Sequence, residues 1–410
     1  MLNTSPPSLL RPFYFFVVVW GERFRHYLTH YCLPSLLAPD NLPALHNRQQ
    51  NKLLICTTVA DWHALKSTLI FKKLSDYVTP IFIEIPLPAA GVSSCQHMGI
   101  GHQLATELCF RDKAYGLALT PDLLLANGTL ANVQNRAQMG YTVILCAALR
   151  FAEEKFFHQL HPLCSRSFQE DSAEPLTLSS RQLVQLSLHS FHSETETYDF
   201  ESPYFAVKTP IALWRLPDQK GMIIHSLSWC PLLIDYSAIV KHSTLALETW
   251  TMDGDYIHSN FDYSERIYVC TDSDEMMLLS WAPLAYQAVP VKAGNLRRWW
   301  PSLCPIINRY FLQETLIYPI FDPLKLCLFP KAVRWHIDDL DDSWQFIEKK
   351  IQRALCTQRT WHDALFHFGF VCTHVFKKTI RGAIILFTAC FGNPSARQKI
   401  KRRVKLLLST

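Results

Sequence analysis

Two acidic residues separated by a single position could carry acid–base chemistry. Asp253 and Asp255 flank Gly254 in the segment 251–256. In an extended strand both carboxylates would point to the same side, where they could orient hydroxyl groups or serve as base and ligand. Asp-Gly is also a turn signal, so the alternative is a segment that only reverses the chain. Both residues are catalytic candidates, and both interpretations stay open.

A histidine and a second group of acids could also meet a charged ligand. His225 ends a strand-like segment and is a candidate contact for a phosphate or an acceptor, although a histidine beside a strand is often structural. Residues 271–275 carry three carboxylates, for which Asp272 or Ser273 as a helix N-cap is the plainer explanation. The four acids of residues 336–342 precede a helix and are interpreted as a solvated cap.

These side chains must be positioned by regular elements, and the first 150 residues alternate strand-like with helix-like segments. We predict strands over 13–19, 52–58, 78–85, 116–119 and 141–147, and helices over 23–37, 61–73, 97–115 and 130–138. Such alternation implies crossover connections and parallel strands. The predicted fold class is therefore α/β, with a mainly parallel Rossmann-like sheet, helices on both faces, an α+β extension and a C-terminal helical module.

Several common kinds of active site are excluded by their missing motifs. The chain has no G-x-x-x-x-G-K-[ST], no H-E-x-x-H and no G-x-S-x-G, and its G-x-G, Gly99 to Gly101, lacks the third glycine of a dinucleotide fingerprint. The 13 cysteines include no C-x-x-C pair, which argues against a zinc knuckle or a redox pair. Scattered cysteines favour reduced thiols in the cytosol.

Four segments, taken in order, carry a family resemblance. They are Phe-Val-Val-Val-Trp-Gly-Glu-Arg at 16–23, Leu-Pro-Ser-Leu-Leu at 33–37 with Asn-Leu-Pro at 41–43, Leu-Leu-Ile-Cys-Thr-Thr at 53–58, and Leu-Thr-Pro-Asp-Leu-Leu-Leu-Ala-Asn-Gly-Thr-Leu at 119–130. Together they resemble the GT-A-type nucleotide-sugar glycosyltransferases. The similarity is to a bacterial glycosyltransferase-like group whose first strand ends in a Trp-Gly turn, and it covers residues 13 to about 283.

The resemblance implies a donor site at the ends of the first strands. Its candidate residues are Val19, Trp20, Gly21, Thr57, Thr58, Asp61, Asp122, Asn127 and Gly128. General sheet geometry also predicts a ligand site at the carboxyl ends of the strands. The alternative is that Trp20 and Gly21 only form a turn and that Asp61 only caps a helix.

The resemblance also implies a divalent metal held by an Asp-x-Asp motif. Mg²⁺ or Mn²⁺ would bridge donor phosphates, which requires hard oxygen ligands. The matching stretch is Thr120, Pro121 and Asp122, so Asp122 is the candidate metal ligand and Thr120 replaces the first carboxylate. Asn127 stands where a second carboxylate could have helped. Alternatively, Asp122 caps a turn.

The chain divides by composition into four parts. We predict a nucleotide-binding α/β half at 1–150, an acceptor-side α+β half of the same domain at 151–291, a helical module at 292–376 and a basic amphipathic tail at 377–410. The tail holds nine basic and no acidic residues, which suits an anionic membrane surface, although a solvated basic helix is the alternative. With an acidic body and no recognition module, nucleic acid is not an expected partner.

Composition bounds the remaining possibilities. The 410 residues are 49% hydrophobic and 18% charged, which excludes a disordered chain. The uncharged stretches 276–291 and 382–396, of 16 and 15 residues, fall short of the ~20 apolar residues of a spanning helix. We predict a cytoplasmic glycosyltransferase, peripheral on the inner face of a membrane, that uses a nucleotide-sugar donor and an unidentified acceptor. The alternative is a catalytically inactive relative that acts as a membrane-associated binding or scaffold protein.

Overall fold

The computed structural model describes residues 10–46, 48–164, 168, 171–206, 209–262, 266–286, 304–317, 323–355, 379 and 383. The chain forms two compact units, Met1–Ile351 and Gln352–Thr410. The first unit contains both halves predicted at 1–150 and 151–291. The predicted tail at 377–410 lies outside the described residues apart from two positions, so its structure stays a prediction.

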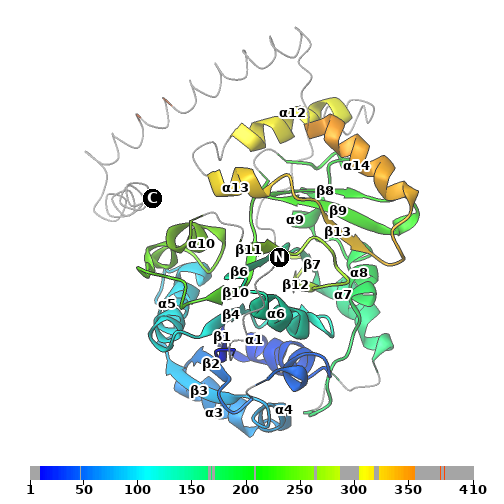
Figure 1. The fold of residues 1–410 in the computed structure, drawn as a ribbon. Coiled ribbons are helices and arrows are strands. Elements are labelled where there is room, and N and C mark those ends of the chain that lie inside the picture. Colours follow the sequence, from blue (N-terminus) through cyan, green and yellow to red (C-terminus); the bar gives the residue numbers. More distant parts are fainter. Residues whose placement is uncertain are drawn as a thin grey trace. The chain divides into compact units, whose positions relative to one another are not determined.

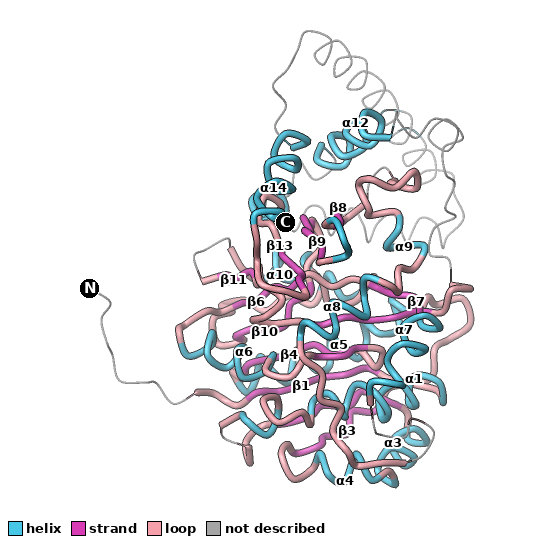
Figure 2. The backbone as a smooth tube through the Cα atoms, turned by 90° about the vertical axis from the view of Figure 1, so that its right-hand side faces the viewer, coloured by secondary structure: helices cyan, strands magenta, loops and turns pink. Residues whose placement is uncertain are grey.

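A seven-stranded sheet forms the centre of the first unit, in the order β11-β6-β10-β4-β1-β2-β3 (Figure 2). Its strands are β1 (Phe13–Val18), β2 (Lys52–Thr57), β3 (Thr79–Glu84), β4 (Tyr115–Leu119), β6 (Val143–Cys146), β10 (Cys230–Asp235) and β11 (Ile267–Val269). Neighbouring strands are parallel except where β10 runs antiparallel to β4 and β6. The predicted α/β class with a mainly parallel sheet is confirmed.

Strand β1 shows why the sheet is covered on both faces. Its sequence FYFFVV is apolar throughout and every residue is buried, as expected of a strand inside a doubly covered sheet. Alternate side chains enter two different core clusters, with Phe16 on one side and Phe15 on the other. Helix α5 (Ser94–Asp112) covers the first face, and α4 (Leu69–Leu74) and α6 (Thr129–Gln138) cover the second (Figure 1).

The other helices connect the strands or pack around the sheet. They are α1 (Glu22–Tyr27), the π-helical η1 (Leu28–Cys32), α2 (Leu33–Leu36), η2 (Leu42–Ala44), α3 (Val59–Ser67), α7 (Glu153–Leu160), η3 (His161–Leu163), α8 (Ser180–Leu188), α9 (Ser193–Glu196), η4 (Pro217–Gln219), η5 (Leu245–Glu248), α10 (Gly254–Asn260), α12 (Cys304–Ile317), α13 (Pro323–Leu328) and α14 (Asp342–Leu355). The helix predicted over 61–73 is two helices, because Thr68 ends α3 and caps α4.

Two small sheets join distant parts of the chain. One contains β5 (Leu123–Leu125), β12 (Leu278–Ala282) and β7 (Arg150–Ala152), and the other β8 (Ile211–Arg215), β9 (Gly221–Ser226) and β13 (Val333–His336). Strand β13 lies in the segment 292–376, so the predicted helical module also contributes a strand, which pairs with β9. No helix among the described residues is long and apolar enough to cross a bilayer.

Candidate functional site

The carboxyl ends of β1, β2 and β4 meet at one edge of the central sheet because the three strands are parallel neighbours. Residues 19–21, 57–58 and 120–122 occupy these ends. In open α/β sheets, ligands bind outside the carboxyl ends of the strands. The predicted donor residues from three separate segments therefore share one edge, which we call the donor edge.

A buried carboxylate fixes the turn after β1. Gly21 has a φ of 79°, a left-handed conformation that favours glycine, and its N–H donates to Asp61 Oδ2 at 3.1 Å. The Thr58 hydroxyl donates to the same oxygen at 2.9 Å, and Arg25 forms an ion pair with Asp61. Thr58 is the N-cap of α3, so the interpretation of Asp61 as the cap was wrong. Asp61 instead joins the ends of β1 and β2.

Trp20 and Thr57 bring an aromatic ring and an unpaired hydroxyl to the donor edge. Trp20 packs edge-on against His97 of α5, with ring centroids 4.8 Å apart. Burial lowers the pKa of His97. Among the described residues, neither His97 Nε2 nor Thr57 Oγ1 has a hydrogen-bond partner, although both atoms are buried. Val19 is fully buried in the core, and its role in donor binding stays a prediction.

Asp122 lies just beyond β4 and close to a cation. Burial raises the pKa of its carboxyl, and the charge of Arg150 and a hydrogen bond from Thr120 oppose this rise. Arg150 begins β7, and its Nη1 lies 3.4 Å from Glu194 Oε2. Its buried Nε has no hydrogen-bond partner among the described residues. Arg150 was not predicted as a site residue.

A second group missed from the sequence surrounds Glu153, at the start of α7. Glu153 Oε2 accepts from Arg23 Nη2 at 2.7 Å and from the Tyr27 hydroxyl at 2.6 Å. The charge of Glu153 also contributes to the raised pKa of Asp122. One sequence signal was available, because Arg150 and Glu153 follow the strand predicted over 141–147 much as Asp122 follows the strand predicted over 116–119.

Asn127 and Gly128 support the start of α6. Asn127 Oδ1 accepts from the Asp40 N–H at 2.9 Å, and its Nδ2 donates to Asp40 Oδ2 at 2.7 Å. Gly128 has a φ of 91° and precedes the first residue of α6. The Asn127 side chain is therefore engaged with Asp40, and a role of either residue in donor binding stays a prediction.

Asp253 and Asp255 do not form the extended pair, which was one of the two interpretations that the sequence left open. Asp253 is the N-cap of α10, where its Oδ1 accepts from the Asp255 N–H at 2.9 Å, and Asp255 pairs with Lys325 of α13. The extended interpretation was wrong because Gly254 already begins the helix. Burial, reinforced by the charge of Asp255, raises the pKa of Asp253 to about 6. The neighbouring Met252 N–H donates to His102 Nδ1 of α5 at 3.1 Å.

His225 belongs to the small sheet β13-β9-β8. Its side chain is buried, its Nδ1 lies 2.9 Å from the Phe329 carbonyl oxygen, and its ring packs edge-on against Trp214. Burial lowers the pKa of the imidazole. These contacts account for a structural histidine, and a contact with phosphate or acceptor stays a prediction.

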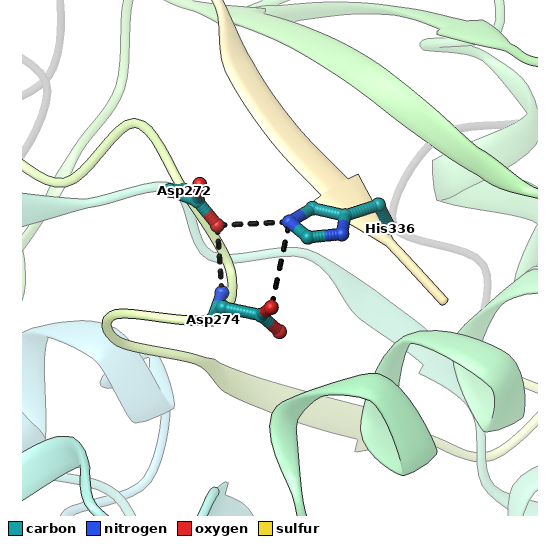
Figure 3. A group of neighbouring side chains, drawn as sticks. All are labelled: Asp272, Asp274 and His336. Atoms are coloured by element: carbon teal, nitrogen blue, oxygen red, sulfur yellow. Dashed lines mark hydrogen bonds and ion pairs between the residues drawn. The ribbon is translucent and has the colours of Figure 1, made fainter. Parts of the chain in front are cut away.

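A group that could hold a metal ion forms after β11, where Asp272 and Asp274 face His336 of β13 (Figure 3). The three potential ligand atoms lie within 4.8 Å of one another. His336 Nε2 is 2.9 Å from Asp272 Oδ1 and 4.0 Å from Asp274 Oδ2, and its Nδ1 is 2.7 Å from the Asp338 carbonyl oxygen. A ring nitrogen held by a carbonyl is typical of histidines that bind metal through the other nitrogen.

The same group is also a closed ion-pair network. The hydrogen bond to Asp272 raises the pKa of His336 and lowers that of Asp272, and Arg181 pairs with Asp274. The helix start predicted at Asp272 or Ser273 was wrong. Residues 272–275 form a turn, in which the Asp274 N–H donates to Asp272 Oδ1 at 2.8 Å.

The residues around Asp122 do not fit the metal site that the resemblance implies. Thr120 supplies no carboxylate, Asn127 is engaged with Asp40, and no group of three His, Cys, Asp or Glu ligands among the described residues includes Asp122. The Asp272 group follows β11, three strand positions from β4, or roughly 14 Å at the usual strand spacing. It cannot complete the coordination of an ion bound to Asp122.

Comparison with known proteins finds only partial likeness. No family model matches the chain. No curated protein matches it in sequence. Among solved structures, S. aureus TarS 1–349 is 12% identical with a TM-score of 0.25, over 36% of this chain and 39% of that one.

Two further structures match a similar share of the chain. A Bacillus anthracis protein described as a glucose-1-phosphate thymidylyltransferase is 8% identical with a TM-score of 0.22, over 35% of this chain and 57% of that one. Rv0371c from Mycobacterium tuberculosis is 10% identical with a TM-score of 0.23, over 35% and 69%. The chain thus spans less than half of the TarS fragment, and these values establish neither its family nor its activity.

Proposed function

We propose that the chain transfers a sugar from a nucleotide-sugar donor to an acceptor, with the donor bound at the donor edge. The observation that carries this proposal is the convergence of Trp20, Thr57 and Asp122 at the carboxyl ends of neighbouring strands, with the charge of Arg150 acting on Asp122. Buried polar atoms of Thr57 and Arg150 lack hydrogen-bond partners among the described residues. Buried polar groups in folded proteins are nearly always hydrogen-bonded. A ligand rich in oxygen atoms would satisfy them.

Each group has a chemical role that suits such a donor. Trp20 is half-buried and offers part of an aromatic face to a base, while Asp122 can accept hydrogen bonds from sugar hydroxyls. In the transfer step the acceptor oxygen bonds to the sugar's anomeric carbon. The sugar–phosphate bond breaks with its electron pair going to the nucleoside diphosphate. The acceptor's proton passes to a base.

The acceptor side of the proposal uses the predicted residues Asp253, Asp255 and His225. Asp253 is the best candidate for the base because its pKa of about 6 is close to the value that suits a proton acceptor near neutral pH. Asp255, exposed beside it, would contribute charge to acceptor binding. His225 is buried in the sheet β13-β9-β8, so it would support the surface of that sheet and would not touch the acceptor itself.

A second function is favoured by one specific observation. Thr120 in place of a carboxylate, together with the engaged side chain of Asn127, is the pattern expected of a relative that has lost catalysis. Such a protein would bind a nucleotide sugar, or a partner at the same edge, without turnover.

Nucleotide binding and turnover together test the two functions. Isothermal titration with uridine, guanosine, adenosine, cytidine and thymidine diphosphates, with and without Mn²⁺, should detect one preferred base. Asp122→Asn should reduce release of nucleoside diphosphate from the matching sugar donor while leaving the melting temperature nearly unchanged. Asp76→Asn, an exposed control, should change neither. Binding without any release, in wild type as in Asp122→Asn, would favour the inactive relative, and no binding would refute the proposal.

Membrane association through residues 377–410 is a separate part of the proposal. Nine basic residues and no acidic ones, interleaved with aliphatic residues, suit the surface of an anionic bilayer. Flotation with vesicles containing phosphatidylserine should recover the full chain but not one truncated before Lys377. Equal recovery of both, or of neither, would refute this part.

A further inference from the structure

A diphosphate bound at the donor edge would bring two negative charges. The residues around Asp122 do not form the ligand set of a divalent ion that could neutralise them. Asp122 is the lone carboxylate of its segment, since Thr120 occupies the other position. An ion placed beside Asp122 would also approach the positive charge of Arg150, which already acts on this carboxyl. We infer that Arg150, in place of an Asp122-bound divalent ion, carries the negative charge of the donor's diphosphate, an inference that rests on the proposed function.

The small sheet fixes Arg150 near Asp122. Ser280 of β12 pairs with Arg150 on one side and with Leu123, the residue after Asp122, on the other. The backbones of Arg150 and Leu123 are therefore two strand spacings apart, about 10 Å. The long side chain of Arg150 can cross most of this distance. This geometry explains why the two charges interact although they form no direct ion pair among the described contacts.

The guanidinium of Arg150 has donors left for a ligand. Its Nη1 contact with Glu194 is long, at 3.4 Å, while the other Glu194 oxygen accepts from Tyr198 at 2.8 Å. Its Nε has no hydrogen-bond partner among the described residues. An arginine presents several N–H donors in a planar fork that matches phosphate oxygens two at a time. The Arg150 side chain is 39% exposed, so a diphosphate would be held by the exposed N–H groups of this fork.

The fork also suits the leaving group of the transfer step. As the sugar–phosphate bond breaks, its electron pair adds negative charge to the diphosphate oxygen. A fixed cation at that place stabilises the charge where it develops. Arg150 would thus assist both donor binding and departure of the nucleoside diphosphate.

The test compares nucleoside diphosphates with nucleosides on the full chain. Titrations of the preferred diphosphate, run in EDTA and in Mn²⁺, should give dissociation constants within about threefold of each other. Arg150→Met should weaken diphosphate binding about 10- to 100-fold, as expected for a hydrogen-bonded charged group. Arg150→Lys should recover part of the loss. Binding of the bare nucleoside should be the same in wild type and Arg150→Met.

A matched control separates this effect from a general loss of charge. Arg136 of α6 is also ion-paired and partly exposed, with Glu275 as its partner, and Arg136→Met should leave diphosphate binding within twofold. Circular dichroism melting shows whether Arg150→Met is folded, and Arg150→Lys keeps the test valid if it is not. Binding that requires Mn²⁺, or that Arg150→Met leaves intact, overturns the inference while the proposed function stands. No nucleotide binding under any condition overturns both.

Discussion

The ion pair between Arg25 and Asp61 should contribute measurably to stability, because it lies under the donor edge. Asp61 accepts from Gly21 and Thr58 and pairs with Arg25, and its side chain is only 8% exposed while that of Arg25 is 28% exposed. We predict that Arg25→Met and Asp61→Asn each destabilise the chain and that the two changes are coupled in a double-mutant cycle.

The magnitude follows from burial. Removing one partner of a fully buried pair costs about 3–5 kcal/mol because the other charge is left unpaired. Arg25 retains access to water, so its charge can be hydrated when Asp61 is replaced, and the cost falls toward the ~1.5–3 kcal/mol of a hydrogen bond to a charged group. We expect a coupling free energy of about 1–2 kcal/mol. The exposed pair Lys73–Asp76, at 48% and 61% exposed, should show the ~0.3–0.5 kcal/mol of a surface pair.

Equilibrium urea unfolding can measure both cycles. Trp20 and Trp62, two of the 11 tryptophans, lie next to Gly21 and Asp61 in the sequence, so tryptophan fluorescence includes a signal from this part of the molecule. Coincidence with the transition seen by circular dichroism is required before a two-state free energy is taken. Equal coupling in the two cycles would refute the argument, since it would mean that burial of Asp61 adds nothing to the ion pair.

Three further predictions concern packing and titration. Gly101→Ala should lower the free energy of unfolding by about 1–3 kcal/mol, because its Cβ would lie 2.6 Å from Val18 Cγ2 and 2.9 Å from Cys56 Cβ. Gly254→Ala is the neutral control, because its Cβ would meet nothing within 4 Å. Equal melting temperatures of the two variants would contradict the prediction. The raised pKa of His336 implies stabilisation that is complete below its ordinary pKa of 6.5 and is lost as pH rises through its folded pKa. In EDTA, His336→Gln should flatten the dependence of the melting temperature on pH above 6.5, and an unchanged slope would count against this prediction. The raised pKa of Asp253 means that its ionisation destabilises the fold as pH rises from its unfolded pKa of 3.8 through its folded pKa of about 6. Asp253→Asn retains a good N-cap and should melt at a higher temperature than wild type at pH 7.5 but not at pH 3.5. A higher melting temperature at both pH values would point to another cause.

Local pattern was sufficient for β1, β2, β3, β4 and β6 and for most of the helices between them, but not for β10, which runs antiparallel in the middle of the sheet. The apolar, β-branched run of residues 13–18 has to be buried on both faces, and the alternation of strands with helices leaves a parallel sheet as the economical arrangement. The same holds for the start of α8, where the Ser179 hydroxyl accepts from the backbone N–H of Gln182, three residues further along. These features depend on neighbours in the chain, which is why the sequence reveals them.

The side-chain partners in the site depended on contacts that no spacing encodes. Asp253 and Asp255 were open to an extended and a turn interpretation. The structure instead has Asp253 as the N-cap of α10, just after Met252, whose N–H is hydrogen-bonded to α5. From the sequence, the acids of 271–275 and those of 336–342 were interpreted as separate caps. In the structure, strand β13 places His336 beside Asp272 and Asp274.

The sequence by itself determined which strand ends would carry polar residues, because a parallel sheet with buried strands can place such residues only where the strands stop. Only the tertiary structure decided which charges meet there. Arg150 reaches the surroundings of Asp122 through β12, a strand from more than 100 residues further along the chain. Electrostatic interactions act through space over a few ångströms, whereas sequence patterns report only on neighbours within one helix or strand.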